Sequence, residues 1–250
     1  MGIHCESKEE YIYEMMKNFK LVDMREQYMD IITEATNESL SYIDFLVRLI
    51  KVEEHGKLAR RNSKLINSAC FDITSTLEDI DYSFNPSIDA DKINSLGTLQ
   101  FMDKHENIIL IGPPGVGKSL IATGIGRNAC KAGKTVLFIN AKELVDKLYE
   151  SMKYGDLVEL LKKLDKIELL IIDELSYIKM DKERESLFFQ MIRRRYEKGS
   201  LIITTNLPLG KWDSLFSGQL AATAILDRLI HHCHILSISG DSYRVKGKNR

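Results

Sequence analysis

A glycine-rich segment at residues 112–119 carries the residue types best suited to chemistry. It reads Gly112-Pro113-Pro114-Gly115-Val116-Gly117-Lys118-Ser119, a complete G-x-x-x-x-G-K-[ST] phosphate-binding loop. Its glycines allow backbone N–H groups to curl around an anion, and a helix beginning at the loop adds partial positive charge. Lys118 is expected to reach the β- and γ-phosphates, and Ser119 to hold Mg²⁺. The segment, together with Leu120, therefore predicts a site for ATP.

Polar residues end two further apolar segments downstream of this loop. Asp173 and Glu174 follow Leu169–Ile172, and Asn206 follows 201–205. Asp173 is expected to lie beside the metal, while Glu174 polarises a water aimed at the γ-phosphate. Asn206 can bond that water or the phosphate. A water-activating acid favours hydrolysis, and it argues against a kinase that phosphorylates a small molecule.

Five apolar runs are the predicted strands that position these residues. Because the runs are continuous, the strands are expected to be buried on both faces, as in a parallel sheet between helices. The sequence thus predicts an α/β fold with a mainly parallel five-stranded sheet. The predicted strands are Asn107–Ile111, Thr135–Ile139, Leu169–Asp173, Leu201–Thr205 and His234–Ile238.

The chain before residue 89 has a different character. We expect a small all-helical domain at 1–70, a linker at 71–88, and the ATPase domain at 89–250. Four cations recur at helical spacing and would share one helix face, which favours contact with DNA; a solvated face is the open alternative. Lys153, beside Tyr154, is a further candidate for phosphate contact and base stacking, with a plain helix turn as its alternative. The four cations are Lys57, Arg60, Arg61 and Lys64.

Charge is unevenly divided along the chain. Residues 1–106 contain 12 Lys and Arg against 20 Asp and Glu, a balance of −8, while residues 107–250 contain 23 against 16, a balance of +7. The basic half suggests a polyanionic partner. We find no apolar run of the roughly 20 residues that would span a membrane, and no C-x-x-C pair, so we expect a cytoplasmic protein with reduced thiols.

The segment from His231 to His234 contains three histidines and Cys233. Adjacent residues on a strand point to opposite faces, and the spacing is not that of metal ligands. We therefore interpret this segment as structural.

Taken together, these motifs resemble the AAA+ ATPases, and more narrowly the IstB-like helper ATPases of insertion sequences, whose relatives are the DnaC-type helicase loaders. The resemblance covers nearly the whole chain. It implies that Arg228 is an arginine finger acting in a neighbouring subunit's site, and that Arg244 contacts nucleotide in its own subunit. Its discriminating parts are the block Ala224-Ile225-Leu226-Asp227-Arg228-Leu229-Ile230-His231-His232 and the terminal Gly240-Asp241-Ser242-Tyr243-Arg244.

The resemblance implies an ATP-dependent helper of transposition. Such a protein would form homo-oligomers on duplex DNA, with ATP at subunit interfaces, and would recruit or stimulate a transposase. The alternative is a helicase loader, which uses its N-terminal domain to grip a helicase. The cationic face at 57–64 favours the helper.

Overall fold

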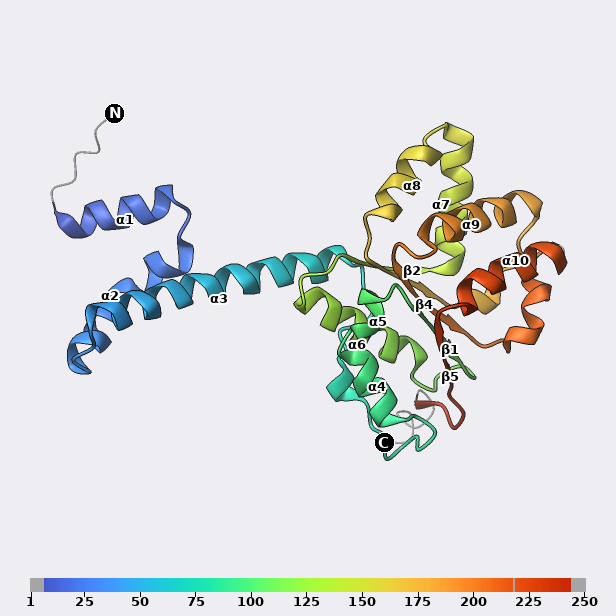
Figure 1. The fold of residues 1–250 in the computed structure, drawn as a ribbon, viewed down its shortest axis with the longest axis horizontal. Helices are drawn as coiled ribbons and strands as arrows, with labels where there is room; N and C mark the ends of the chain where they lie inside the picture. Colours follow the sequence, from blue (N-terminus) through green and yellow to red (C-terminus); the bar gives the residue numbers. More distant parts are fainter. Residues whose placement is uncertain (1–6, 218, 244–250) are drawn as a thin grey trace. The chain divides into compact units, whose positions relative to one another are not determined.

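The computed structural model describes residues 7–217 and 219–243 (Figure 1). The chain divides into two compact units, Met1–Lys64 and Leu65–Arg250. The division falls inside helix α3 (Tyr42–Ser68), close to the domain end predicted at residue 70. Arg244 lies outside the described residues.

The first unit consists of α1 (Lys8–Asn18), α2 (Val22–Asn37) and most of α3. Ser7 caps the start of α1, where its hydroxyl oxygen accepts the Glu10 N–H at 3.1 Å. Three buried residues form the centre of a small core, with four partly buried ones packed against them. These residues are Tyr28, Ile31 and Leu49, then Met16, Met24, Phe45 and Val52.

Glu53 is a buried acid in this unit, and it caps α2. The residue before α2, Leu21, has no side chain that could cap the helix. Instead, the Glu53 carboxylate accepts the N–H groups of Asp23 and Met24 at 2.9 and 3.1 Å. A negative charge at a helix N-terminus is stabilising, so this contact fixes α2 on α3.

Residues 71–88, predicted as a linker, pack into the second unit. They contain the short 3-10 helix η1 (Leu77–Asp79), which contacts α6 (Lys118–Lys131). Leu77, Ile80 and Ile88 are buried in the same cluster as residues of α6. Apolar side chains between the turn-forming residues of this segment account for the packing. The segment leads into α4 (Ala90–Gly97) and α5 (Gln100–Asp103).

The second unit is built on a five-stranded sheet in the order β2-β3-β4-β1-β5. All four strand pairings are parallel, which confirms the predicted sheet, and each strand lies within one residue of its predicted bounds. The strands are β1 (Asn107–Ile111), β2 (Val136–Asn140), β3 (Leu169–Asp173), β4 (Ser200–Thr205) and β5 (Cys233–Ser237).

Helices cover both faces of this sheet (Figure 1). One core cluster contains Ile108 and Leu110 with residues of α4, α5 and α6, and the other contains Ile109 with residues of the remaining helices. Neighbouring residues of a strand point to opposite faces, which explains why β1 is apolar throughout. The remaining helices are α7 (Ala141–Tyr154), α8 (Leu157–Asp165), η2 (Leu175–Tyr177), α9 (Lys182–Arg195), η3 (Leu209–Leu215) and α10 (Gln219–Ile230).

Within the described ranges, no helix combines the length and apolar character that crossing a membrane requires.

Candidate functional site

The predicted phosphate-binding loop connects β1 to α6. Gly115 and Gly117 have φ values of +83° and +102°, a backbone region that side chains other than glycine rarely adopt. A Cβ on Gly115 would also lie 2.0 Å from the Ser242 Oγ. Val116 is fully buried beneath the loop. The loop therefore turns sharply at the N-terminus of α6, where the helix's unpaired N–H groups favour an anion.

Lys118 is the first residue of α6 and is almost completely buried. Its Nζ donates to the carbonyl oxygens of Gly112 and Pro113, both at 2.8 Å. The ammonium group is thus held against the loop that the sequence predicts to bind phosphates.

Ser119 and Asp173 meet at the carboxyl ends of the strands. The Ser119 Oγ lies 2.9 and 3.0 Å from the two carboxylate oxygens of Asp173. Thr204, near the end of β4, donates its hydroxyl to Asp173 at 2.5 Å. A hydroxyl and a carboxylate this close form the oxygen donor set that Mg²⁺ prefers, so the predicted metal residues fit that ion.

Glu174 follows β3 in the left-handed backbone region, with φ of 61°. Its N–H donates to the Thr204 Oγ1 at 2.9 Å, which fixes the turn. The side chain is exposed, and one carboxylate oxygen accepts the Asn140 amide at 3.2 Å. Asn140 and Asp173 are paired residues of β2 and β3, so the sheet register brings this amide to the acid.

Two of these partners were not predicted as site residues. Asn140 also caps α7, since its side chain accepts the Lys142 N–H at 2.9 Å. Thr204 lies within an otherwise mostly apolar run, which gives no sign of a role in the site. Asn140 and Thr204 could have been identified as site residues only from the order of the strands in the sheet, which no sequence motif encodes.

A cavity of about 310 Å³ joins the predicted residues. Asn206 lines it along with Lys118, Ser119 and Glu174, and the Asn206 N–H donates to the Ser176 Oγ at 2.6 Å. The structure therefore brings the loop and the ends of β3 and β4 to one cleft.

The segment predicted as a linker also lines this cavity, as does Tyr243. The segment contributes three apolar side chains and two acids: Ile73, Ile80 and Ile88, then Asp79 and Asp81. The Tyr243 N–H donates to the Gly115 carbonyl at 2.9 Å, and its hydroxyl donates to the Asp81 carbonyl at 2.6 Å. Tyr243, the last described residue, therefore bonds to the phosphate-binding loop and to the 71–88 segment.

Arg228 lies in the last turn of α10, away from this cavity. Its Nη1 donates to the Ala224 carbonyl at 2.7 Å, and its guanidinium lies 4.9 Å from the centre of the Phe189 ring. It lines a small pocket with Asn107 and Leu201, at the amino ends of β1 and β4. The phosphate-binding loop follows the carboxyl end of β1. Within one chain, Arg228 therefore lies at the amino ends of the strands and the loop at their carboxyl ends.

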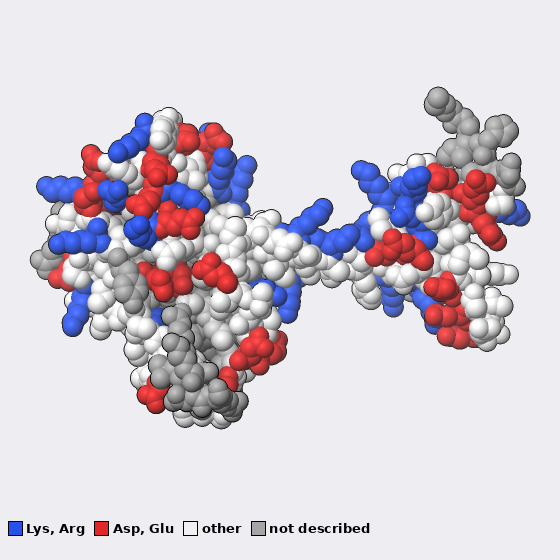
Figure 2. All heavy atoms as spheres, turned by 180° about the vertical axis from the view of Figure 1, so that it is seen from behind, with Lys and Arg blue, Asp and Glu red and all other residues white. Residues whose placement is uncertain are grey.

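The five predicted DNA contacts have mixed surroundings, and Lys and Arg are interspersed with Asp and Glu over the face drawn in Figure 2. The Lys57 Nζ lies 3.6 Å from a Glu53 carboxylate oxygen, and Arg60 pairs with Asp23 and Glu53. Arg60 consequently helps to hold α2 and α3 together. Arg61 and Lys64 are exposed.

Lys153 is one of two cations that contact the ring of Tyr149 on α7. Its Nζ lies 4.4 Å from the centre of the Tyr149 ring, which Arg184 also approaches at 4.0 Å. The next residue, Tyr154, is 84% exposed. A cation beside an exposed aromatic ring can contact a phosphate and stack a base.

Sequence comparison gives matches along almost the whole chain. The model of the family described as IstB-like ATP binding protein matches residues 14–250. The chain is 36% identical over 236 residues to the protein named as the ATP-binding protein of insertion sequence IS21 in Pseudomonas aeruginosa, covering 94% of this chain and 89% of that protein. It is 37% identical over 239 residues to its counterpart for IS5376 in Geobacillus stearothermophilus, covering 96% and 95%.

Solved structures share the fold. DnaI aligns with a TM-score of 0.55 at 20% identity, covering 72% of this chain and 92% of that one. DnaA from Aquifex aeolicus, solved with AMPPCP bound, gives 0.58 at 18% identity, covering 72% and 56%. The DnaC helicase loader gives 0.50 at 23% identity, covering 60% and 87%. These similarities confirm the predicted fold, a parallel five-stranded sheet between helices.

Proposed function

This chain belongs to the IstB-like ATP-binding proteins of insertion sequences, and on that premise we propose that it hydrolyses ATP to assemble on duplex DNA and recruit or stimulate a transposase. The observation that carries the proposal is that one cavity is lined by Lys118, Ser119, Glu174 and Asn206. Asp173 joins this set through its contact with the Ser119 hydroxyl.

In this proposal the phosphates of ATP lie along residues 112–119. Lys118 would release its loop carbonyls and neutralise the β- and γ-phosphates, with Asn206 directed at the γ-phosphate or at the attacking water. Ser119 and Asp173 would hold Mg²⁺, which neutralises developing phosphate charge. The Ile80 and Ile88 side chains and the Tyr243 ring, which line the same cavity, would contact the flat face of the base.

Glu174 would act as the general base. Its carboxylate accepts a proton from a water as that water's oxygen attacks the γ-phosphorus, and the bond to the ADP oxygen breaks. The Asn140 amide already donates to this carboxylate. While this bond is made, the bonded carboxylate oxygen faces Asn140 instead of a water, so Asn140 restrains Glu174.

Asn140→Ser is accordingly expected to raise ATP hydrolysis in the absence of DNA by up to about tenfold, because a hydrogen bond to a charged group contributes about 1.5 kcal/mol. Serine can still cap α7 but is too short to reach Glu174. Asn140→Asp keeps the cap, removes the donor, and should change the rate in the same direction. Phosphate release measures the effect, and equal rates in all three proteins would show that the contact does not restrain Glu174.

DNA binding is proposed to involve the exposed cations Arg61, Lys64 and Lys153. Backbone contacts release condensed counterions, so affinity should fall steeply with salt and depend little on sequence. The Arg61→Ala/Lys64→Ala variant should flatten the salt slope by about two units. Arg60 is left intact because its loss would loosen α2 from α3.

Fluorescence anisotropy on a duplex across a salt series, with a non-hydrolysable ATP analogue, measures this slope. Lys51→Ala is the matched control, since Lys51 is an exposed cation on another face of α3. If the wild-type slope persists in the double variant, the residues form a solvated face. If the wild-type protein does not bind duplex at all, the helicase-loader alternative becomes the better one.

Self-assembly is the third part of the proposal. Arg228 is too far around the sheet to serve its own chain's cavity, so the proposed finger requires a second copy. The helical unit also exposes many large apolar side chains, which we propose to be covered in the assembly. They include Tyr11, Tyr13, Phe19, Tyr42, Ile43, Leu46 and Ile50.

A further inference from the structure

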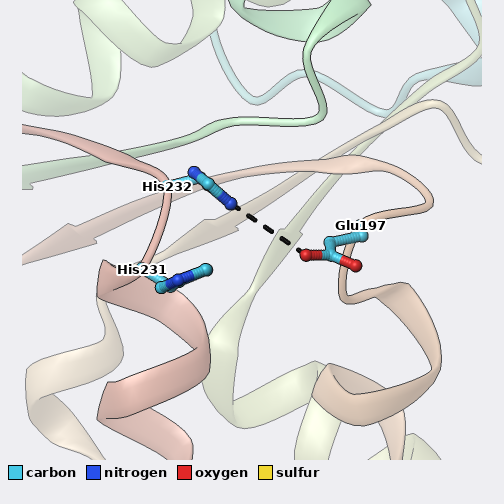
Figure 3. A group of neighbouring side chains, drawn as sticks. All are labelled: Glu197, His231 and His232. Carbon is cyan, nitrogen blue, oxygen red and sulfur yellow. Dashed lines mark ion pairs between the residues drawn. The ribbon is translucent and has the colours of Figure 1, made fainter.

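Glu197, His231 and His232 form a cluster outside the nucleotide cavity (Figure 3). One ligand atom of each lies within 4.8 Å of the others, and in the described part of the chain no other group of three or more such residues is this close. The His232 Nε2 lies 4.0 Å from a Glu197 carboxylate oxygen, and the two imidazole rings are 4.1 Å apart. All three side chains are exposed, so an ion from solution can reach them.

Contrary to the sequence interpretation, His231 and His232 do not lie on a strand, whereas His234 lies on β5. They form the turn between α10 and β5, so alternation between faces does not apply to them. The His231 N–H donates to the Asp227 carbonyl at 3.1 Å, and the His232 carbonyl accepts the Asn107 N–H at 2.7 Å. The backbone on both sides of the pair is thus fixed, with both rings directed toward Glu197.

Tyr196 determines which nitrogen of His231 is available. Its hydroxyl lies 2.8 Å from the His231 Nδ1. When His231 carries its proton on Nδ1, it donates that proton to the Tyr196 hydroxyl, and the Nε2 lone pair is then available to a metal ion. A metal-bound histidine commonly has this arrangement, with its second nitrogen donating to an outer partner.

The nearby arginines and cysteine do not take part. Arg195 and Arg228 border the same corner, but their guanidinium groups donate to the carbonyls of Leu164, Ser200 and Ala224. Cys233 is the first residue of β5, and its sulfur is not among the clustered ligand atoms.

We propose that Glu197, His231 and His232 bind a zinc-class transition-metal ion. Two imidazole nitrogens and one carboxylate oxygen suit Zn²⁺, whereas Mg²⁺ and Ca²⁺ prefer oxygen alone. Bonds of about 2.0 Å in a tetrahedron bring ligand atoms to about 3.3 Å from one another, a movement that exposed side chains can make by rotation. Water or a group from another molecule would complete the coordination. The ion would tie the end of α9 to the α10–β5 turn, and its binding does not depend on ATP hydrolysis.

Zn²⁺ titration of the full-length, nucleotide-free protein, with any histidine tag removed, tests the proposal by calorimetry. We expect one ion per chain, with affinity weakened at least tenfold by Glu197→Gln and by His231→Gln/His232→Gln. Tyr196→Phe should weaken it about tenfold through loss of the outer partner. His55→Gln and Cys70→Ser, at exposed positions elsewhere, should leave it unchanged.

Co²⁺ provides a readout of geometry. The wild-type protein should show the visible absorption of four-coordinate cobalt, and the Glu197 and histidine variants should lose it while keeping the wild-type circular dichroism spectrum. The proposal is overturned if the wild-type protein binds no Zn²⁺, or if the variants bind it as tightly as the wild-type protein does.

Discussion

Glu174→Gln is expected to abolish ATP turnover while ATP remains bound. Glutamine keeps the shape of the side chain and leaves Ser119, Asp173 and Lys118 in place, but its amide cannot accept a proton from the attacking water. General bases contribute about 10²–10⁴-fold to rate, so hydrolysis should fall by that factor. Nucleotide affinity, measured by displacement of a fluorescent ATP analogue, should stay within a few-fold of wild type.

The same variant should prolong assemblies on DNA, because the bound ATP that supports them is not consumed. Glu183→Gln is the matched control, since Glu183 is an exposed acid in the first turn of α9. Loss of ATP binding along with hydrolysis would indicate that Glu174 shapes the cavity. Hydrolysis at the wild-type rate would exclude Glu174 as the base.

The sheet and the phosphate-binding loop could be predicted because each is encoded locally. Strands buried on both faces require continuous apolar runs, and Ile108 to Ile111 is such a run directly before the loop. The loop needs glycine where φ is positive, at Gly115 and Gly117. In both cases neighbouring residues in the sequence carry the whole signal.

Features that depend on distant partners could not be predicted in this way. The Asn140–Glu174 contact depends on β2 and β3 being adjacent in register. Leu77 became part of the core because α6 packs over it, although the surrounding residues are typical of a linker. Arg60 looked like part of a cationic face until the fold brought Asp23 beside it.

Arg228→Ala is expected to leave ATP binding by isolated subunits intact and to lower hydrolysis by about 10³–10⁵-fold, the range of well-studied arginine fingers. In its own chain, Arg228 lies at the amino ends of the strands, whereas the phosphate-binding loop lies at their carboxyl ends. It could therefore stabilise transferring phosphate only in a neighbouring copy. Steady-state phosphate release measures the loss, and Arg193→Ala, at an exposed cation on α9, is the control for a general change in charge.

Mixing two inactive variants separates a finger in trans from a structural arginine. Lys118→Ala subunits lack a working nucleotide site but keep Arg228, whereas Arg228→Ala subunits have the reverse defect. In a random equimolar assembly with head-to-tail contacts, about one quarter of interfaces join an intact site to an intact finger. Activity should recover at those interfaces. Because each variant alone is inactive, recovered activity can come only from a site and a finger on different chains. Light scattering verifies that the two variants assemble together. If they do so and activity does not recover, the role of Arg228 is to hold α10 on Phe189.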